Sequence, residues 1–109
     1  MAEVLAAERA AVVERLGRLE REWWGIIESG SAGADDEHDP EGATLAFERQ
    51  HAAALLSQAR QHLAQVDAAM VGLAEGSYGR CAACGGPIGA ARLVARPVAV
   101  TCIQCASSR

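Results

Sequence analysis

The stretch CAACGGPIGAARLVARPVAVTCIQC, residues 81–105, holds all four cysteines of this 109-residue chain, in two Cys-x-x-Cys motifs. Each motif points two thiolates toward one place, and two such motifs supply the four ligands that Zn²⁺ takes in structural sites. The glycines that follow the first motif suit a tight turn under a metal. Residues 87–101, between the motifs, are expected to form a short hairpin or loop. The predicted zinc ligands are Cys81, Cys84, Cys102 and Cys105.

Two disulfide bonds are the alternative use of these cysteines, and they require an oxidising compartment. The N-terminal Met1-Ala2-Glu3 is acidic and lacks an apolar signal-peptide core. No apolar run approaches the roughly 18–20 residues that span a bilayer. We therefore expect a soluble cytoplasmic protein with no membrane partner, in which the thiols stay reduced and hold zinc.

The zinc ion is expected to fold the C-terminal part of the chain rather than to catalyse a reaction. A segment of roughly 30 residues with few large apolar side chains does not order alone, and a metal supplies the missing stability. Four thiolates leave no open position for water on the metal. The sequence also lacks a phosphate-binding glycine loop and a nucleophile with a recognisable base. We expect no enzyme activity.

Upstream of the cysteines, apolar residues recur at alternating steps of three and four, which predicts two long helices. The first covers residues 2–29. Its heptad seam consists of Leu5, Arg9, Val12, Leu16, Leu19, Trp23 and Ile26. The polar residues 30–38 interrupt this pattern. Trp24 lies one step off the seam, where it either covers the edge of the core or anchors a partner.

The second helix has clear signals at both ends. Asp39 is a natural N-cap and Pro40 a natural first helical residue, while Gly76 stands where a helix commonly stops. Its seam consists of Leu45, Arg49, Ala52, Leu56, Ala59, Leu63, Val66, Met70 and Leu73. Two such stripes joined by a short polar segment predict an antiparallel coiled-coil hairpin.

The expected fold is therefore mainly α-helical, with a coiled-coil hairpin over residues 1–76 and a small Cys₄ zinc finger over residues 77–109. The tip loop of the hairpin, at about 30–42, is acidic. Its carboxylates belong to Asp35, Asp36, Glu37, Asp39 and Glu41. Such a cluster is either a solvated loop or a group that meets basic residues or a metal on a partner.

The C-terminal sequence resembles the zinc finger of the DksA/TraR family of bacterial RNA polymerase-binding factors. The resemblance rests on YGRCAACG at 78–85, PIG at 87–89, RLVARP at 92–97 and CIQC at 102–105. It implies a rod that enters the secondary channel of core RNA polymerase, with the acidic tip near the catalytic centre. It also implies an effect on promoter complexes, often together with the alarmone ppGpp, whose part here the sequence leaves open.

Two further functions remain open at this point. The chain could be a zinc-dependent module that binds another protein through the coil, or a DNA-binding zinc ribbon. All 14 acidic residues lie in residues 1–75, and the finger carries four arginines and no acid. Because general affinity for nucleic acid needs clustered basic residues over the binding surface, we expect no direct sequence-specific DNA binding.

Overall fold

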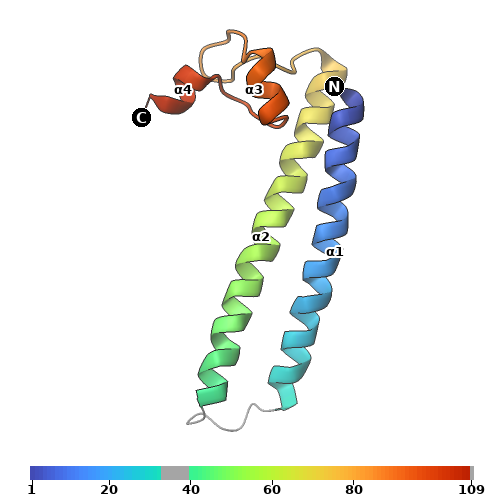
Figure 1. Ribbon diagram of the computed structural model, residues 1–109, viewed down its shortest axis with the longest axis vertical. Coiled ribbons are helices and arrows are strands. Elements are labelled where there is room, and N and C mark those ends of the chain that lie inside the picture. The colour runs from blue at the N-terminus through green and yellow to red at the C-terminus, as the bar shows by residue number, and fades with distance from the viewer. Residues whose placement is uncertain (33–39, 109) are drawn as a thin grey trace. The chain divides into compact units, whose positions relative to one another are not determined.

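The computed structural model describes residues 1–32 and 40–108, and this part of the chain is helical without a β-strand. Two long helices come first, α1 (Ala2–Ala32) and α2 (Pro40–Glu75). Two short helices follow, α3 (Ala90–Ala95) and α4 (Ile103–Ser107), in the cysteine-containing segment (Figure 1). An isolated β-bridge joins Arg80 to Pro87. The predicted fold class is confirmed.

The ends of α2 are those that its sequence signals predict, since it begins at Pro40 and ends directly before Gly76. The first helix is three residues longer than the predicted segment 2–29. It continues to Ala32 because Ser31 and Ala32 are compatible with a helix even after Gly30, which itself lowers helix stability. The polar break is correspondingly shorter than the sequence suggested.

By its internal contacts the chain divides into two compact units. One unit consists of Met1–Arg9 together with Ala64–Arg109, and the other is Ala10–Leu63. In each unit, a segment of α1 lies beside a segment of α2 (Figure 1). No helix in the described ranges, 1–32 and 40–108, is both long and apolar enough to cross a membrane.

The buried side chains of both units come from the predicted seams. In the Ala10–Leu63 unit, Leu19, Leu56 and Ala59 form a core cluster, against which Trp23 and other partly buried apolar residues pack. In the other unit, Leu5 and Val66 are fully buried. Removing such side chains from water is the main favourable term in helix packing. The seam periodicity therefore identified the packed faces of both helices.

In each unit, an ion pair joins α1 to α2. The Nε of Arg9 donates a 2.7 Å hydrogen bond to Oδ1 of Asp67. In the Ala10–Leu63 unit, Nη2 of Arg60 lies 3.9 Å from Oε1 of Glu20. Within each unit, the α1 and α2 segments lie side by side and run in opposite chain directions (Figure 1).

Candidate metal centre

The cysteine-containing segment is attached to the last turn of α2 by backbone hydrogen bonds. The N–H groups of Ser77 and Tyr78 both donate to the carbonyl of Gly72, at 2.9 and 3.1 Å. Gly76 provides the left-handed residue that such a helix end requires, with φ of 86°. This capping leads the chain directly from α2 into the first Cys-x-x-Cys motif.

The first motif is a tight turn of the kind that cradles a metal. The N–H of Cys81 donates to the carbonyl of Gly86 at 2.7 Å, and the N–H of Gly85 donates to the carbonyl of Cys81 at 2.9 Å. Gly85 has φ of 76°, a conformation that side chains other than glycine rarely adopt. The N–H of Gly86 points at the sulfur of Cys84, 3.4 Å away. The two glycines thus serve the turn as the sequence indicated.

The second motif is brought to the first by one backbone contact and presented by a helix. The N–H of Ala82 donates to the carbonyl of Val100 at 2.8 Å, just before the second motif. Cys102 is the residue that precedes α4, and Cys105 lies within that short helix. The helical turn places both thiols on the side that faces Cys81 and Cys84.

The four sulfur atoms form one site, and all lie within 4.8 Å of one another. The sulfurs of Cys84 and Cys102 are 3.9 Å apart. A tetrahedral zinc site with Zn–S bonds of about 2.3 Å places its sulfurs about 3.8 Å apart. All four cysteines are free thiols, so the alternative of two disulfides is not formed. The residues fit one Zn²⁺ ion with complete thiolate coordination, as predicted.

The thiols of this cluster do not titrate alike. Hydrogen bonds from the backbone N–H groups of Cys102 and Cys84 lower the pKa of Cys81 to about 6. Hydrogen bonding of the Cys105 thiol to the sulfur of Cys102 raises its pKa to about 12. The Cys81 thiol therefore loses its proton easily, whereas the Cys105 thiol keeps its proton. Several thiolates close together repel one another unless a cation lies between them. A divalent metal supplies that compensating charge.

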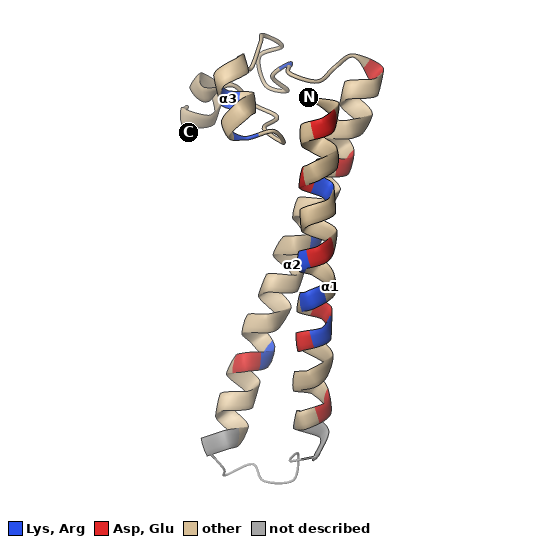
Figure 2. Ribbon diagram, turned by 45° about the vertical axis from the view of Figure 1, so that its right-hand side comes forward, with Lys and Arg blue, Asp and Glu red and all other residues tan. Residues whose placement is uncertain are grey.

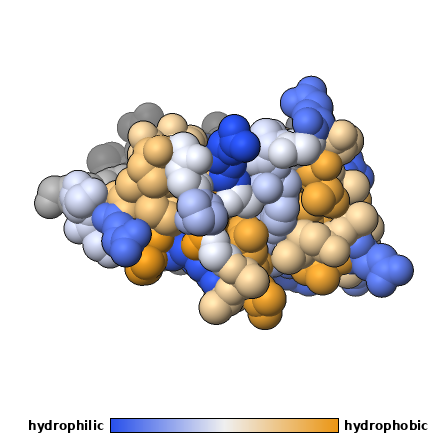
Figure 3. All heavy atoms as spheres, turned by 90° about the horizontal axis from the view of Figure 1, so that it is seen from above, coloured by the Kyte–Doolittle hydropathy of each residue, from blue (hydrophilic) through white to orange (hydrophobic). Residues whose placement is uncertain are grey.

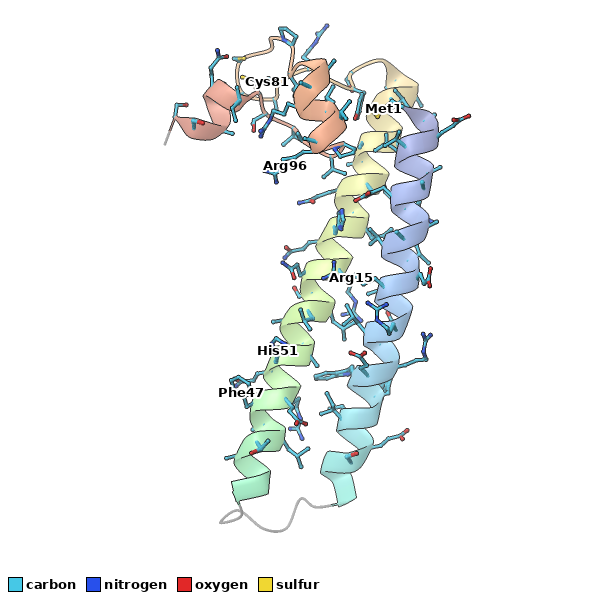
Figure 4. All side chains as sticks on the ribbon, in the orientation of Figure 1. Met1, Arg15, Phe47, His51, Cys81 and Arg96 are labelled. Carbon is cyan, nitrogen blue, oxygen red and sulfur yellow. The ribbon has the colours of Figure 1, made fainter. Side chains whose placement is uncertain are left out.

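Around the sulfurs the finger has a very small core. Cys81 and Cys102 are 2% and 5% exposed, and they pack with Ile88. Leu93 and Ala99 close this cluster from its sides. Two of its three buried residues are metal ligands, so packing alone provides little to hold the segment. The Cys81 side chain lies inside the finger in Figure 4.

The link between the two motifs differs from the expected hairpin or loop. Residues 90–95 form α3, which begins after Gly89 at φ of 102°. Alanine-rich sequence favours a helical turn here, and Leu93 anchors it on the core. The Nε of Arg92 donates to the carbonyl of Thr101 at 2.8 Å, which ties α3 to the second motif.

A second tie was not foreseen from the sequence. The hydroxyl of Tyr78 donates to the carbonyl of Pro97 at 2.7 Å, and burial raises the pKa of this phenol. A lone tyrosine next to a cysteine motif was the available signal.

The remaining surface is mixed: Val94, Val100 and Ile103 are exposed, and Figure 3 shows apolar and hydrophilic groups side by side on the face it views.

The other predicted site residues lie away from the metal ligands or outside the described part. Trp24 is 60% exposed, so it does not cover the core as its neighbour Trp23 does. The predicted tip residues fall outside the described residues, either wholly or, at Glu41, in their side chains. These are Asp35, Asp36, Glu37, Asp39 and Glu41.

Comparison with known proteins supports the same identification. Residues 76–109 match the sequence model of the prokaryotic dksA/traR C4-type zinc finger. No curated protein sequence matches the chain significantly. Among solved structures, the chain is similar to that of transcription factor DksA2 from Pseudomonas aeruginosa, with 27% identity and a TM-score of 0.58. The similarity covers 94% of this chain and 79% of that one. Residues 76–109 thus carry a zinc finger of the dksA/traR C4 type, and the chain as a whole is similar to the transcription factor DksA2.

Proposed function

We propose that this protein is a transcription regulator that binds core RNA polymerase through the secondary channel. The observation that carries the proposal is the likeness to the transcription factor DksA2 over 94% of the chain, helices and finger together. A zinc finger alone is compatible with many partners, whereas the pairing of this finger with two long antiparallel helical segments is far more specific.

The division of labour follows from the contacts. Zinc folds the finger, because the finger's own core is limited to Ile88 and the ligands with a few partly buried neighbours. The Gly72 carbonyl, which receives two N–H groups from residues 77 and 78, fixes the finger to the end of α2. The seams make the helical pair stiff enough to act as a narrow insert. We propose a cytoplasmic location, where polymerase is found and thiolates stay reduced.

The metal is proposed to have no catalytic part. The four sulfurs lie close enough together to fill a tetrahedron around one ion, which leaves no position for a substrate or a water molecule. The protein would then act by occupying and reshaping its partner, and not as an enzyme.

The contacts with polymerase are proposed to come from the acidic tip and from exposed aromatic residues near it in the sequence. Asp35 to Glu41 supply carboxylates that could meet basic groups or the ligand sphere of a catalytic Mg²⁺. Trp24 is exposed, and Phe47 is 71% exposed and stacks on His51. The side chains of Phe47 and His51 project from the side of α2 away from α1 (Figure 4). Exposed aromatic residues are frequent binding hot spots.

The test is a binding measurement with purified core RNA polymerase. The zinc-loaded chain is expected to bind, and Trp24→Ala is expected to weaken the complex by about tenfold or more if Trp24 is a hot spot. Val13→Ala is the matched control, since it also removes an exposed apolar side chain from α1. Absence of binding by the intact chain would exclude the proposal.

A DNA-binding role has one observation in its favour, since the finger has arginines and no acid. One of these, Arg92, is engaged by the carbonyl of Thr101 inside the finger. Affinity for free duplex DNA that falls steeply with salt would support this second function. We expect little such binding. A protein partner other than polymerase becomes the better hypothesis only if core RNA polymerase does not bind the chain.

A further inference from the structure

Two side chains hold the segment that leads into the second Cys-x-x-Cys motif. The hydroxyl of Tyr78 donates to the carbonyl of Pro97 at 2.7 Å. The Nε of Arg92 donates to the carbonyl of Thr101 at 2.8 Å. Both bonds are partly buried and of similar length, yet they fall on different peptide groups. The peptide group held by Arg92 includes the backbone nitrogen of Cys102, a metal ligand, whereas the one held by Tyr78 includes no ligand atom.

The Thr101–Cys102 peptide group also faces the sulfur cluster. Its N–H donates a hydrogen bond to the sulfur of Cys81. A trans peptide group is planar, and its C=O and N–H point in opposite directions, so that holding the carbonyl oxygen also fixes the direction of the N–H. One rigid group thus connects Arg92 on its carbonyl side with Cys81 on its N–H side.

Apolar packing contributes little to the orientation of this peptide group. Ala99 packs against the core of the finger with only a methyl group, and Val100 is 64% exposed. The N–H of Ala82 holds the carbonyl of Val100 at 2.8 Å, but the next peptide group can still turn about the single bonds of Thr101. Its orientation therefore depends on its own hydrogen bonds.

Arg92 also brings a positive charge toward the thiolates. Four thiolates around one Zn²⁺ retain a net negative charge. Residues 76–108 contain arginines and no acidic residue (Figure 2), so no carboxylate of the finger competes for the guanidinium. A hydrogen bond from a charged donor is stronger than one between neutral groups. It also polarises the peptide group, which makes the N–H a better donor to the sulfur.

We propose that Arg92 is a positioning residue of the zinc site, which orients the Thr101–Cys102 peptide group so that its N–H donates to the Cys81 thiolate. Groups that hydrogen-bond metal ligands from outside orient them and tune the metal, and their loss typically lowers metal affinity by about 10–100-fold. Here the arginine acts on a ligand through one peptide group. The proposal concerns the zinc site alone and does not depend on the partner that the protein binds.

The test observes the N–H···S bond directly, by NMR of the full chain loaded with an NMR-active cadmium isotope in place of zinc. A hydrogen bond from an amide to a metal-bound sulfur transmits scalar coupling between the amide proton and the metal nucleus. The wild-type chain is expected to show this coupling at Cys102. Arg92→Met keeps the side-chain length up to the Nε position but removes the donor, so the coupling should disappear. Arg92→Gln places an amide nitrogen at that position, so the coupling should return.

Two control variants separate positioning from a general loosening of the finger. Tyr78→Phe removes the other partly buried hydrogen bond, and Arg96→Met removes an exposed arginine at the C-terminal end of α3. Both are expected to keep the coupling at Cys102, even where the finger becomes less stable. The zinc affinity of Arg92→Met should be about tenfold or more below that of Arg96→Met.

Absence of the coupling in the wild-type chain overturns the proposal, and so does its persistence in Arg92→Met. If Arg92→Met takes up no cadmium while Arg92→Gln shows the coupling, the proposal is supported, because the two differ in the donor at one position. If neither variant at position 92 takes up the metal, or if Tyr78→Phe also abolishes the coupling, the arginine has no specific role toward the ligand and the proposal fails. The measurement needs no polymerase, so its failure is distinct from a failure of the proposed function.

Discussion

Removal of zinc is expected to unfold the finger, residues 76–108, and to leave the helical pair in residues 10–63 intact. The finger's buried residues in the described range are Cys81, Ile88 and Cys102. Burying Ile88 contributes about 2–3 kcal/mol, whereas structural zinc in small fingers contributes about 10–16 kcal/mol at neutral pH. The metal thus contributes several times more free energy to folding of the finger than its largest buried apolar side chain does. The core of the Ala10–Leu63 unit contains no metal ligand, so its stability should not depend on zinc.

The aromatic residues allow the two parts to be followed separately in one sample. Tyr78 is the only tyrosine of the chain and lies in the finger, while Trp23 and Trp24 are the only tryptophans and lie in the helical pair. Burial raises the pKa of Tyr78 in the folded finger. After chelation, its tyrosinate absorbance should titrate at the ordinary value of about 10, while tryptophan emission stays unchanged. Added Zn²⁺ should restore the raised pKa, and Ca²⁺ should not, because thiolates bind zinc far better.

Two results would refute this reasoning. If the titration of Tyr78 is the same with and without metal, the finger does not depend on zinc for its fold. If tryptophan emission changes together with the tyrosine signal, the Ala10–Leu63 unit is not independent of the metal.

Three further outcomes are expected. Leu56→Ala should lower the free energy of unfolding by about 2–5 kcal/mol in urea titrations, because Leu56 is buried in the seam, while the exposed neighbour change Ser57→Ala should stay within about 0.5 kcal/mol. Gly76→Ala should destabilise by about 1 kcal/mol, because φ is positive there, whereas Gly25→Ala in the open interior of α1 should stabilise by about as much. A large effect of the first control, or equal signs for the glycine pair, would contradict these assignments. Zinc affinity can be measured by competition with a chromogenic chelator, and it should fall as pH falls. The fall should be steeper below about pH 6, because Cys81 also takes up a proton there. An affinity that does not depend on pH would contradict thiolate ligation.

The elements with strong local signals could be predicted from the sequence. The proline at position 40 and the glycine at position 76 mark the ends of α2, and the structure has them there. The four cysteines come together as their spacing predicts. In each case the information is local, because a cap, a helix stop and a Cys-x-x-Cys turn depend on a few neighbouring residues.

The rest depends on contacts between distant residues. Arg9 was visible as a charged member of an apolar seam, but its partner Asp67 could not be assigned, because a seven-residue period is compatible with several alignments. The helix α3 was missed for a similar reason. Residues 90–95 are too short for a periodic signal, and their helix is held by Leu93 in the zinc core and by Arg92 on Thr101. Trp24 lies one helix position, about 100°, off the seam, so the pattern placed it at the edge of the packed face but did not decide whether that edge is covered.

Site-specific photocrosslinking to purified core RNA polymerase tests the proposed function most directly. A photoreactive amino acid at position 39 should give adducts close to the polymerase active centre, while the same group at the exposed Val94 of the finger should give adducts elsewhere. Adducts from position 39 confined to the outer surface of the polymerase, in a complex that forms normally, would contradict entry through the secondary channel.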